Sequence, residues 1–279
     1  MKNIKAIILD WAGTSVDFGC MGPALVFVEI FRRWNLDLTP ELARLPMGLA
    51  KKDHTRVLLE MPEIKQQWLD LYGRLPKEKD VDDIFSLITP TMNEIISEFA
   101  VPVPGCINFM EQMKKHSVKV GSTTGYMTEI MDKLVPEAAS QGFVPDCVIS
   151  SSDVPAGRPA PYMCYLNATK MGVFPMNQMV KIGDTIADIQ EGLNAGMWTI
   201  GVTKSGNEVG MSWDTINETD PDLIETLVNK AATKLMDAGA HFVCEGIWEC
   251  YQILLEIDNR ISKGEHPSLR RTNLFSTSI

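Results

Sequence analysis

The sequence has no long apolar run and no cysteine pairing motif. Its six cysteines include no C-x-x-C pair and no metal-ligand spacing, so we expect reduced thiols. The apolar run at residues 6–9 stops at Asp10, which makes it too short for a signal peptide, and no stretch approaches the roughly 18 apolar residues of a membrane span. These absences predict a cytoplasmic protein without membrane association.

An excess of basic residues is also lacking. The 279 residues carry 26 basic against 36 acidic side chains, a net charge of −10, and the basic residues are scattered. A nucleic-acid partner is therefore not expected, and any bound anion must be held locally. A hydrophobic content of 45% predicts a folded chain with one large domain or two unequal ones.

Short apolar runs alternate with amphipathic segments, a pattern typical of a parallel sheet covered by helices on both faces. The runs expected to form strands are 4–9, 118–122, 147–149, 179–182 and 198–202. The segments expected to form helices are 106–115, 128–139, 161–171, 186–195 and 222–238. The fold class predicted is α/β, a Rossmann-like parallel sheet core formed by residues 1–20 and 100–262.

Residues 21–99 interrupt this alternation, because helical patterns follow one another there without an intervening strand. These patterns are 24–34, 52–59, 65–72 and 81–99. We expect an inserted all-helical cap domain, called the cap below, with VPVPG at residues 101–105 linking it back to the sheet. The tail 263–279 is expected to be disordered.

Polar residues follow several of the predicted strands, where ligands bind in open α/β sheets. They are Asp10, Thr124, Arg158, Asp184 and Asp188. Each alone can be read as a cap or loop residue, but Asp184 and Asp188 are one helical turn apart and can face the same cleft as Asp10. Carboxylates suit Mg²⁺, while a hydroxyl and a guanidinium suit phosphoryl oxygens.

In this order, the residues resemble the motifs of the haloacid dehalogenase superfamily of phosphotransferases. The matching segments are the aspartate after the first strand, GSTTGY, the arginine of DVPAGRP, and GDTIAD. Ala12 departs from the superfamily pattern for phosphate esters, in which a second aspartate protonates the leaving group. Such an acid typically contributes about 10²- to 10⁴-fold, and alanine cannot replace it.

The segment LPMGLAKKDHTRVL offers another chemistry. Lys51 lies three positions after Gly48 and three before His54, so the three residues can share one face of the cap. A solvated basic turn is the alternative reading of the lysine pair. A lysine beside an aldehyde can form a protonated imine, which would let carbon leave phosphorus as an enamine, with no oxygen to protonate.

Read together, DWAGTSVDFGC, PMGLAKKDH, GSTTGY, DVPAGRPAPYMCY and GDTIADIQEGLNAGMW resemble the phosphonatase family over residues 2–258. The resemblance implies hydrolysis of phosphonoacetaldehyde to acetaldehyde and phosphate, with Lys51 forming the imine and Lys52 on the solvent side. It implies that Asp10 attacks phosphorus to give an aspartyl-phosphate. It also implies Mg²⁺ held by Asp10, the Ala12 carbonyl and Asp184.

By the same resemblance, Asp188 supports the waters of the metal, and Thr124 and Arg158 bind the phosphoryl oxygens. The aldehyde end would be lined by Cys20, Met47, Gly48, His54 and Tyr126, with His54 relaying a proton through water.

Two rival functions remain at this point, a phosphate-ester phosphatase or phosphomutase of the same superfamily and a non-catalytic binding protein. The family resemblance further implies a homodimer formed through the cap. An apolar stripe of Phe27, Ile30, Phe31 and Trp34 could supply that interface, or could equally be the core of the cap.

Overall fold

The protein contains a six-stranded parallel sheet of strand order β3-β2-β1-β4-β5-β6 in a computed structural model that describes residues 1–267. The strands are β1 (Ala6–Leu9), β2 (Lys119–Thr124), β3 (Cys147–Ser150), β4 (Met179–Gly183), β5 (Trp198–Val202) and β6 (Phe242–Cys244). β1 lies at the centre, pairing Ala6 with Lys119 of β2 and with Met179 of β4. The end of β1 is therefore flanked by the ends of two neighbours.

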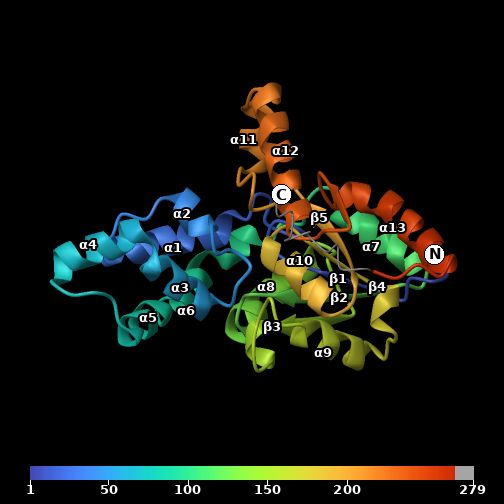
Figure 1. Ribbon diagram of the computed structural model, residues 1–279, viewed down its shortest axis with the longest axis horizontal. Coiled ribbons are helices and arrows are strands. Elements are labelled where there is room, and N and C mark those ends of the chain that lie inside the picture. Colours follow the sequence, from blue (N-terminus) through green and yellow to red (C-terminus); the bar gives the residue numbers. More distant parts are fainter. Residues whose placement is uncertain (268–279) are drawn as a thin grey trace, which may run out of the picture.

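Helices cover both faces of this sheet (Figure 1). They are α7 (Cys106–Lys115), α8 (Thr128–Ser140), α9 (Tyr162–Met171), α10 (Ile186–Asn194) and α13 (Ile247–Ser262), whereas α11 (Trp213–Glu218) and α12 (Pro221–Asp237) project from the core, with α12 contacting β5 and β6 (Figure 1). Ile7 and Leu9 belong to the same buried cluster as residues of α7 and α13, whereas Ala6 and Ile8 pack with residues of α9. Alternate residues of β1 thus point to opposite faces, and both faces are apolar, as expected for a buried parallel strand.

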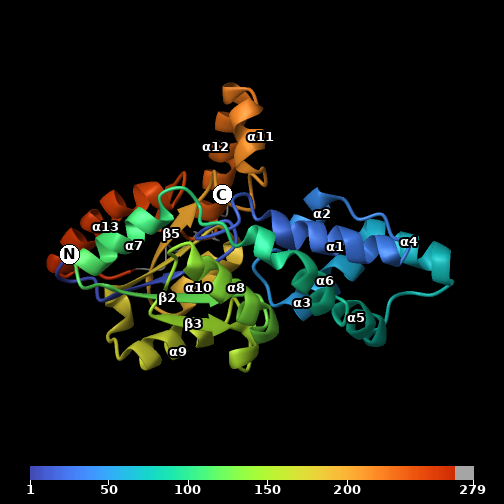
Figure 2. The ribbon, with the colours of Figure 1, turned by 180° about the vertical axis from the view of Figure 1, so that it is seen from behind.

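The cap consists of helices inserted between β1 and β2, and it lies beside the sheet at one end of the molecule (Figures 1 and 2). Its elements are α1 (Met21–Arg33), α2 (Pro40–Arg44), α3 (Lys51–Glu60), α4 (Pro62–Tyr72), α5 (Glu78–Phe85), α6 (Ile88–Ile95) and the 3₁₀ turn η1 (Ile96–Phe99). Phe27, Ile30 and Phe31 are buried within a single chain. These three residues of the predicted stripe are therefore core of the chain itself, whereas Trp34 is half-buried.

The two chain segments that join the cap to the core lie side by side. Val16 forms a bridge with Pro102, and the backbone N–H of Val103 donates to the Ser15 carbonyl oxygen at 2.9 Å. Asp17 and Cys20 on the outgoing segment have left-handed φ values of 54° and 51°. Both connections consequently meet beside the end of β1.

All five strands expected from apolar runs are present, and the α/β class with a helical insertion is confirmed. The sequence analysis did not predict α2, β6, α11 or α13, and the segment expected as one helix over 81–99 is divided among α5, α6 and η1. Most of the tail expected to be disordered, residues 268–279, lies outside the described residues. The six cysteines are free thiols, and no helix within residues 1–267 is long and apolar enough to cross a membrane.

Candidate active site

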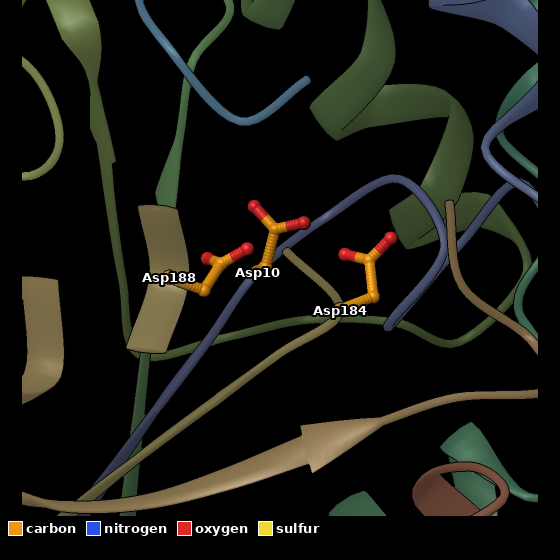
Figure 3. A group of neighbouring side chains, drawn as sticks. All are labelled: Asp10, Asp184 and Asp188. Carbon is orange, nitrogen blue, oxygen red and sulfur yellow. The ribbon is translucent and has the colours of Figure 1, made fainter. Parts of the chain in front are cut away.

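Three buried carboxylates meet at the carboxyl ends of β1 and β4. Asp10 directly follows β1, Asp184 directly follows β4, and Asp188 lies in the first turn of α10. Figure 3 shows Asp10 between the other two, with all three side chains pointing to the same side. One ligand oxygen from each lies within 4.8 Å of the others, a spacing that suits a metal ion. The structure thus brings together the aspartates selected from the sequence.

Hydrogen bonds fix the orientation of Asp184. The Thr14 hydroxyl donates to Asp184 Oδ1 at 3.1 Å, and the backbone N–H of Asn207 donates to Oδ2 at 2.7 Å. Burial and the nearby charges of Asp10 and Asp188 raise the pKa of Asp184 well above its usual range. A cation in this space would remove that unfavourable charge clustering.

Two buried cations neutralise part of the acidic cluster. Arg158 Nη2 lies 2.6 Å from Asp10 Oδ1, and Arg158 Nη1 lies 3.0 Å from Asp188 Oδ1. Lys181, on β4, lies 2.8 Å from Asp188 Oδ1, and Glu191 of α10 contacts both cations. Burial opposes ionisation of Asp188, but the Arg158 and Lys181 charges outweigh it and lower the pKa of its carboxyl group.

The charges of this network are not balanced by the protein alone. Asp10, Asp184, Asp188 and Glu191 provide four buried carboxyl groups, and all but Asp184 form ion pairs with the two cations of the network. Two positive charges are therefore lacking when all four groups are ionised, the charge of one divalent metal ion. The residues present fit such an ion in donor type, spacing and charge.

Sequence reasoning did not select Lys181 or Glu191. Lys181 occupies a fully buried position in β4, and Glu191 is also fully buried. A lysine within an otherwise apolar strand was the available signal, because an ionised lysine is almost never fully buried without a partner.

A small cavity lies between these carboxylates and the cap. It offers about 30 Å³ to water-sized groups, space for roughly two water molecules. Its lining residues are Asp10, Ala12, Cys20, Pro23, Met47, Gly48, Lys51, Thr124, Gly125, Tyr126, Arg158 and Thr185. Eight of the residues selected from the sequence besides Asp10 are thereby placed around one space. Pro23, Gly125 and Thr185 were not selected, since a proline, a glycine and a capping threonine carry no distinctive chemical signal.

Lys51 enters this cavity from the first turn of α3. Its Nζ lies 5.0 Å from the ring centroid of Tyr126 and 5.6 Å from that of Phe27, and the nearest polar contact given by the structure is Met47 Sδ at 4.0 Å. Burial lowers the pKa of Lys51 to about 8, against the opposing charges of neighbours such as Asp10. The amine is thus far easier to deprotonate than an ordinary lysine.

Lys52 has the opposite surroundings. Its side chain is 40% exposed and forms ion pairs with Asp82 and Glu78 on α5. These partners raise the pKa of Lys52, with the Asp82 hydrogen bond as the largest cause. The two adjacent lysines are therefore distinct, as the sequence analysis expected, and Lys51 alone of the pair faces the carboxylates.

Close backbone contacts hold the cap against the core at this point. A Cβ added to Gly48 would lie 2.3 Å from Thr185 Oγ1, and one added to Gly125 would lie 2.7 Å from the Leu49 carbonyl oxygen. Gly48 also has a φ of 89°, which disfavours any side chain. The glycines consequently allow the loop before α3 to rest directly on the ends of β2 and β4.

The remaining walls around Lys51 carry few charges. Burial raises the pKa of the Cys20 thiol and of the Tyr126 hydroxyl well above their usual ranges, so both are protonated at neutral pH. The Tyr126 hydroxyl is buried and has no hydrogen-bond partner within the described residues. The space beside Lys51 is thus weakly polar, which suits the carbon end of a small substrate better than a second phosphate.

His54 differs from its expected place, because it does not line the cavity. It is fully buried on α3, stacks on Phe27 with ring centroids 4.0 Å apart, and its Nε2 lies 2.9 Å from the Ala43 carbonyl oxygen. A carbonyl accepts only, so Nε2 carries the proton and Nδ1 keeps its lone pair. Burial and the Lys51 charge lower the pKa of His54 well below its usual value, leaving a neutral ring. Lys51 and His54 therefore lie on the same helix, as their spacing suggested, but only Lys51 lines the cavity.

Comparison with known proteins identifies the family of this chain. Residues 4–196 match the family model of the haloacid dehalogenase-like hydrolases. The chain is 45% identical to phosphonoacetaldehyde hydrolase of Nitratidesulfovibrio vulgaris, covering 95% of this chain and 94% of the relative. It is 42% identical to phosphonoacetaldehyde hydrolase of Bacillus cereus, covering 92% and 98% of the two chains.

A solved structure is similar over the whole described fold. The phosphonoacetaldehyde hydrolase-like protein of Oleispira antarctica superposes with a TM-score of 0.93 at 34% identity, covering 95% of this chain and 96% of the other. Both the sequence relatives and this structure therefore span the sheet and the cap together. The chain belongs to the phosphonoacetaldehyde hydrolase family of the haloacid dehalogenase-like hydrolases.

Proposed function

We propose that this protein hydrolyses phosphonoacetaldehyde to acetaldehyde and phosphate by cleaving the carbon–phosphorus bond. The observation that carries the proposal is the cavity in which the Lys51 amine faces Asp10 and Arg158 while Ala12 occupies the position next to them. A nucleophile and an imine-forming amine are present in one site, but a second acid is not present at residue 12. This combination suits a carbon leaving group.

The phosphonate end of the substrate would bind at the carboxyl ends of β1 and β2. Thr124 lies at the end of β2 and lines the cavity with Arg158. The Arg158 guanidinium provides charge-assisted hydrogen bonds, and the Thr124 hydroxyl and neighbouring backbone N–H groups add donors for phosphoryl oxygens. These contacts would direct phosphorus toward Asp10 and the aldehyde carbon toward Lys51.

Lys51 would then activate the carbon–phosphorus bond. Its free amine adds to the aldehyde, loss of water gives the imine, and protonation makes that imine an electron sink. The pKa of about 8 leaves a useful fraction of free amine at neutral pH. Cys20, Met47 and Tyr126 surround this end and keep bulk water from the imine.

Asp10 would attack phosphorus as the carbon–phosphorus bond breaks. The bonding pair moves into the imine to form a neutral enamine on Lys51, and phosphorus is transferred to the Asp10 carboxylate. Water then hydrolyses the aspartyl-phosphate to phosphate, while protonation and hydrolysis of the enamine release acetaldehyde and free Lys51. His54 lies outside the cavity but on the same helix as Lys51, and its Nδ1 has no hydrogen-bond partner within residues 1–267. We therefore keep it as the candidate for relaying a proton through water.

The metal of this site is proposed to be Mg²⁺, held by Asp10, Asp184 and the Ala12 carbonyl, with Asp188 supporting its waters. When bound, it would offset the charge of the carboxylates and phosphoryl oxygens. Asp188 is already held by Arg158 and Lys181, which favours an outer position over direct ligation. Removal of divalent ions with EDTA should abolish turnover, and added Mg²⁺ should restore it.

A trapping experiment tests the covalent step. Borohydride added with phosphonoacetaldehyde should inactivate the protein and leave a reduced two-carbon adduct on Lys51 alone, located by peptide mass mapping. Lys51→Arg should be inactive, whereas Lys52→Arg, changed at the exposed neighbour, should stay active. An adduct on Lys52, or continued turnover without any adduct, would contradict the imine mechanism. Rapid hydrolysis of p-nitrophenyl phosphate by the same protein would favour a phosphate-ester phosphatase instead.

The domain organisation and the oligomer are part of the proposal. Residues 1–20 and 100–262 would form the core and residues 21–99 a cap that moves over it. A homodimer through the cap would have to use a face other than the buried one of α1, and Leu25, Val28 and Ile95 line a groove on the outside of α1 and α6. Light scattering of the wild type and of Leu25→Glu distinguishes that interface from a monomer.

A further inference from the structure

The loop that follows β5 contacts the metal-site carboxylate, the connection to the cap, and the cap itself. We call residues 203–211 the bracket loop. The backbone N–H of Gly19 donates to the Ser205 carbonyl oxygen at 2.7 Å, and the Ser205 hydroxyl donates to the Gly13 carbonyl oxygen at 2.7 Å. The sequence analysis gave this loop no role. Its contacts place it beside both the outgoing connection and the end of β1.

A reciprocal pair of hydrogen bonds joins the bracket loop to the cap. Asn207 Nδ2 donates to the Arg44 carbonyl oxygen at 3.1 Å, and Arg44 Nη1 donates to Asn207 Oδ1 at 3.4 Å. Asn207 is buried, and Arg44 is half-buried at the end of α2. Arg44 Nη1 also donates to the carbonyl oxygens of Gly19 and Cys20, at 2.7 and 3.0 Å. One guanidinium therefore ties the cap to the connection and to the core.

The packing around this pair leaves little freedom. A Cβ added to Gly210 would lie 2.8 Å from Arg44 Nε, and one added to Gly206 would lie 2.5 Å from the Cβ of Asp184. The guanidinium thus lies against the bracket loop on one side, while the loop lies against the metal-site carboxylate on the other. The backbone N–H of Asn207 completes the connection by donating to Asp184 at 2.7 Å.

Opening of the cap must break these contacts. The cavity holds only about two water molecules, and its lining is shared between the cap, with Met47, Gly48 and Lys51, and the core. A substrate with a phosphonate and a two-carbon aldehyde is larger than this, so the cap must shift to admit it between Lys51 and Asp10. The two Arg44–Asn207 hydrogen bonds cross from cap to core and are therefore lost on opening.

We propose that Arg44 and Asn207 form a latch that holds the cap closed over the carboxylates, and that they act as positioning residues for Lys51. The latch depends on the proposed function in one respect, the role of Lys51 in binding the substrate. Its closure of the cavity is a property of the free protein and is measured without substrate. The failure of one proposal is thereby distinguishable from the failure of the other.

Alkylation of Cys20 measures closure directly. Cys20 lines the cavity and is 2% exposed, whereas Cys106 is equally buried in α7, away from the cap. N-ethylmaleimide labelling of the two thiols, followed by peptide mass mapping, gives the rate at Cys20 with Cys106 as internal reference. Asn207→Ala removes both latch hydrogen bonds but keeps the backbone N–H to Asp184, so Mg²⁺ affinity should not change.

Loss of a latch hydrogen-bond pair should raise the Cys20 rate about five- to tenfold in Asn207→Ala, with the Cys106 rate unchanged. Arg44→Ala should also raise the Cys20 rate, and the double variant should exceed the larger single effect by less than twofold, because the pair acts as a unit. Arg56→Ala, which removes an exposed cap arginine paired with Asp53 and Glu78, should leave the Cys20 rate unchanged. The proposal would be overturned by an unchanged Cys20 rate in Asn207→Ala or by equal rises in the rates at Cys20 and Cys106. It would also be overturned if the two single effects on the Cys20 rate multiplied in the double variant.

Discussion

The low pKa of Lys51 predicts a pH dependence for both reactivity and stability. Burial lowers this pKa from 10.5 to about 8. At pH 7 about one amine in ten is then deprotonated, compared with about one in three thousand for an ordinary lysine, a gain of about 300-fold. The neighbouring Cys20 and Asp10 act against this shift of the Lys51 pKa, but burial outweighs them.

The rate of imine formation should follow this titration. At cyanoborohydride concentrations high enough for imine formation to limit the overall rate, we expect trapping at Lys51 to rise about tenfold per pH unit below pH 8 and to level off above it. Stopped samples analysed by mass spectrometry between pH 6 and 10.5 give the curve. A rate that continued to climb past pH 9.5 would refute the reasoning, because it would mean that the amine titrates like a solvated lysine.

Stability provides an independent measurement of the same quantity. Since the pKa of Lys51 is lower in the folded than in the unfolded protein, the charged amine destabilises the fold below pH 8. The difference between 10.5 and about 8 corresponds to about 3 kcal/mol, an upper estimate for one fully buried group. This cost disappears as the pH rises from 8 through 10.5, because the unfolded chain binds the proton more tightly over that range.

Lys51→Met removes the charge while keeping a flexible apolar side chain. Urea unfolding should show the variant more stable than the wild type by up to about 3 kcal/mol at pH 7, with the difference shrinking toward pH 10.5. The comparison cancels other titrating groups, which both proteins share. A stability difference that stayed constant from pH 7 to 10.5 would contradict the low pKa, even if the variant were inactive.

Three further changes test other parts of the site. Asp10→Asn should abolish turnover, because the amide is no nucleophile. It should leave the melting temperature nearly unchanged, because the amide keeps an oxygen for Arg158 and the lost charge relieves repulsion with Asp184; substantial residual activity would identify a different attacker. Gly48→Ala should reduce kcat/KM at least tenfold, because its Cβ would meet Thr185. Gly73→Ala is the control, since Gly73 has a similar positive φ but open space around it, and it should keep its activity. Equal activities of the two variants would show that the close approach at Gly48 is unimportant. Glu191→Gln should lower the free energy of unfolding by about 3 kcal/mol, since it removes the ion pairs that Glu191 makes with both Arg158 and Lys181, and an unchanged urea midpoint would argue against that network.

The parts of the fold and site predicted from the sequence are those with a local signal. Strand β5 was expected at its observed residues and helix α7 at both of its ends, because each is a continuous apolar or amphipathic segment. Strand β6, with only Phe242–Cys244, is too short to show a period and is defined by its pairing with β5. Asp10 and Asp184 stood out because an acid directly follows each apolar run.

The rest of the site depends on contacts between distant residues. Lys181 and Glu191 face Arg158 only after β4, α10 and the loop after β3 are assembled, and Asn207 reaches Arg44 from 163 positions away. His54 shows that helical spacing alone does not predict which residues line a cavity. Its position on α3 follows from the pattern, but Phe27 and Ala43 determine that it lies outside the cavity.

The central position of β1 constrains the order in which the newly made chain can assemble. Ala6 pairs with Lys119 and with Met179, so its two partners are synthesised 113 and 173 residues later. Such long separations make sheet closure slow, whereas helices such as α3 and α5 contact one another over short distances along the chain. The first strand of the sheet is therefore made long before its partners, while the helices after it can gain native contacts, and Asp10 acquires its final surroundings only when β4 has been made.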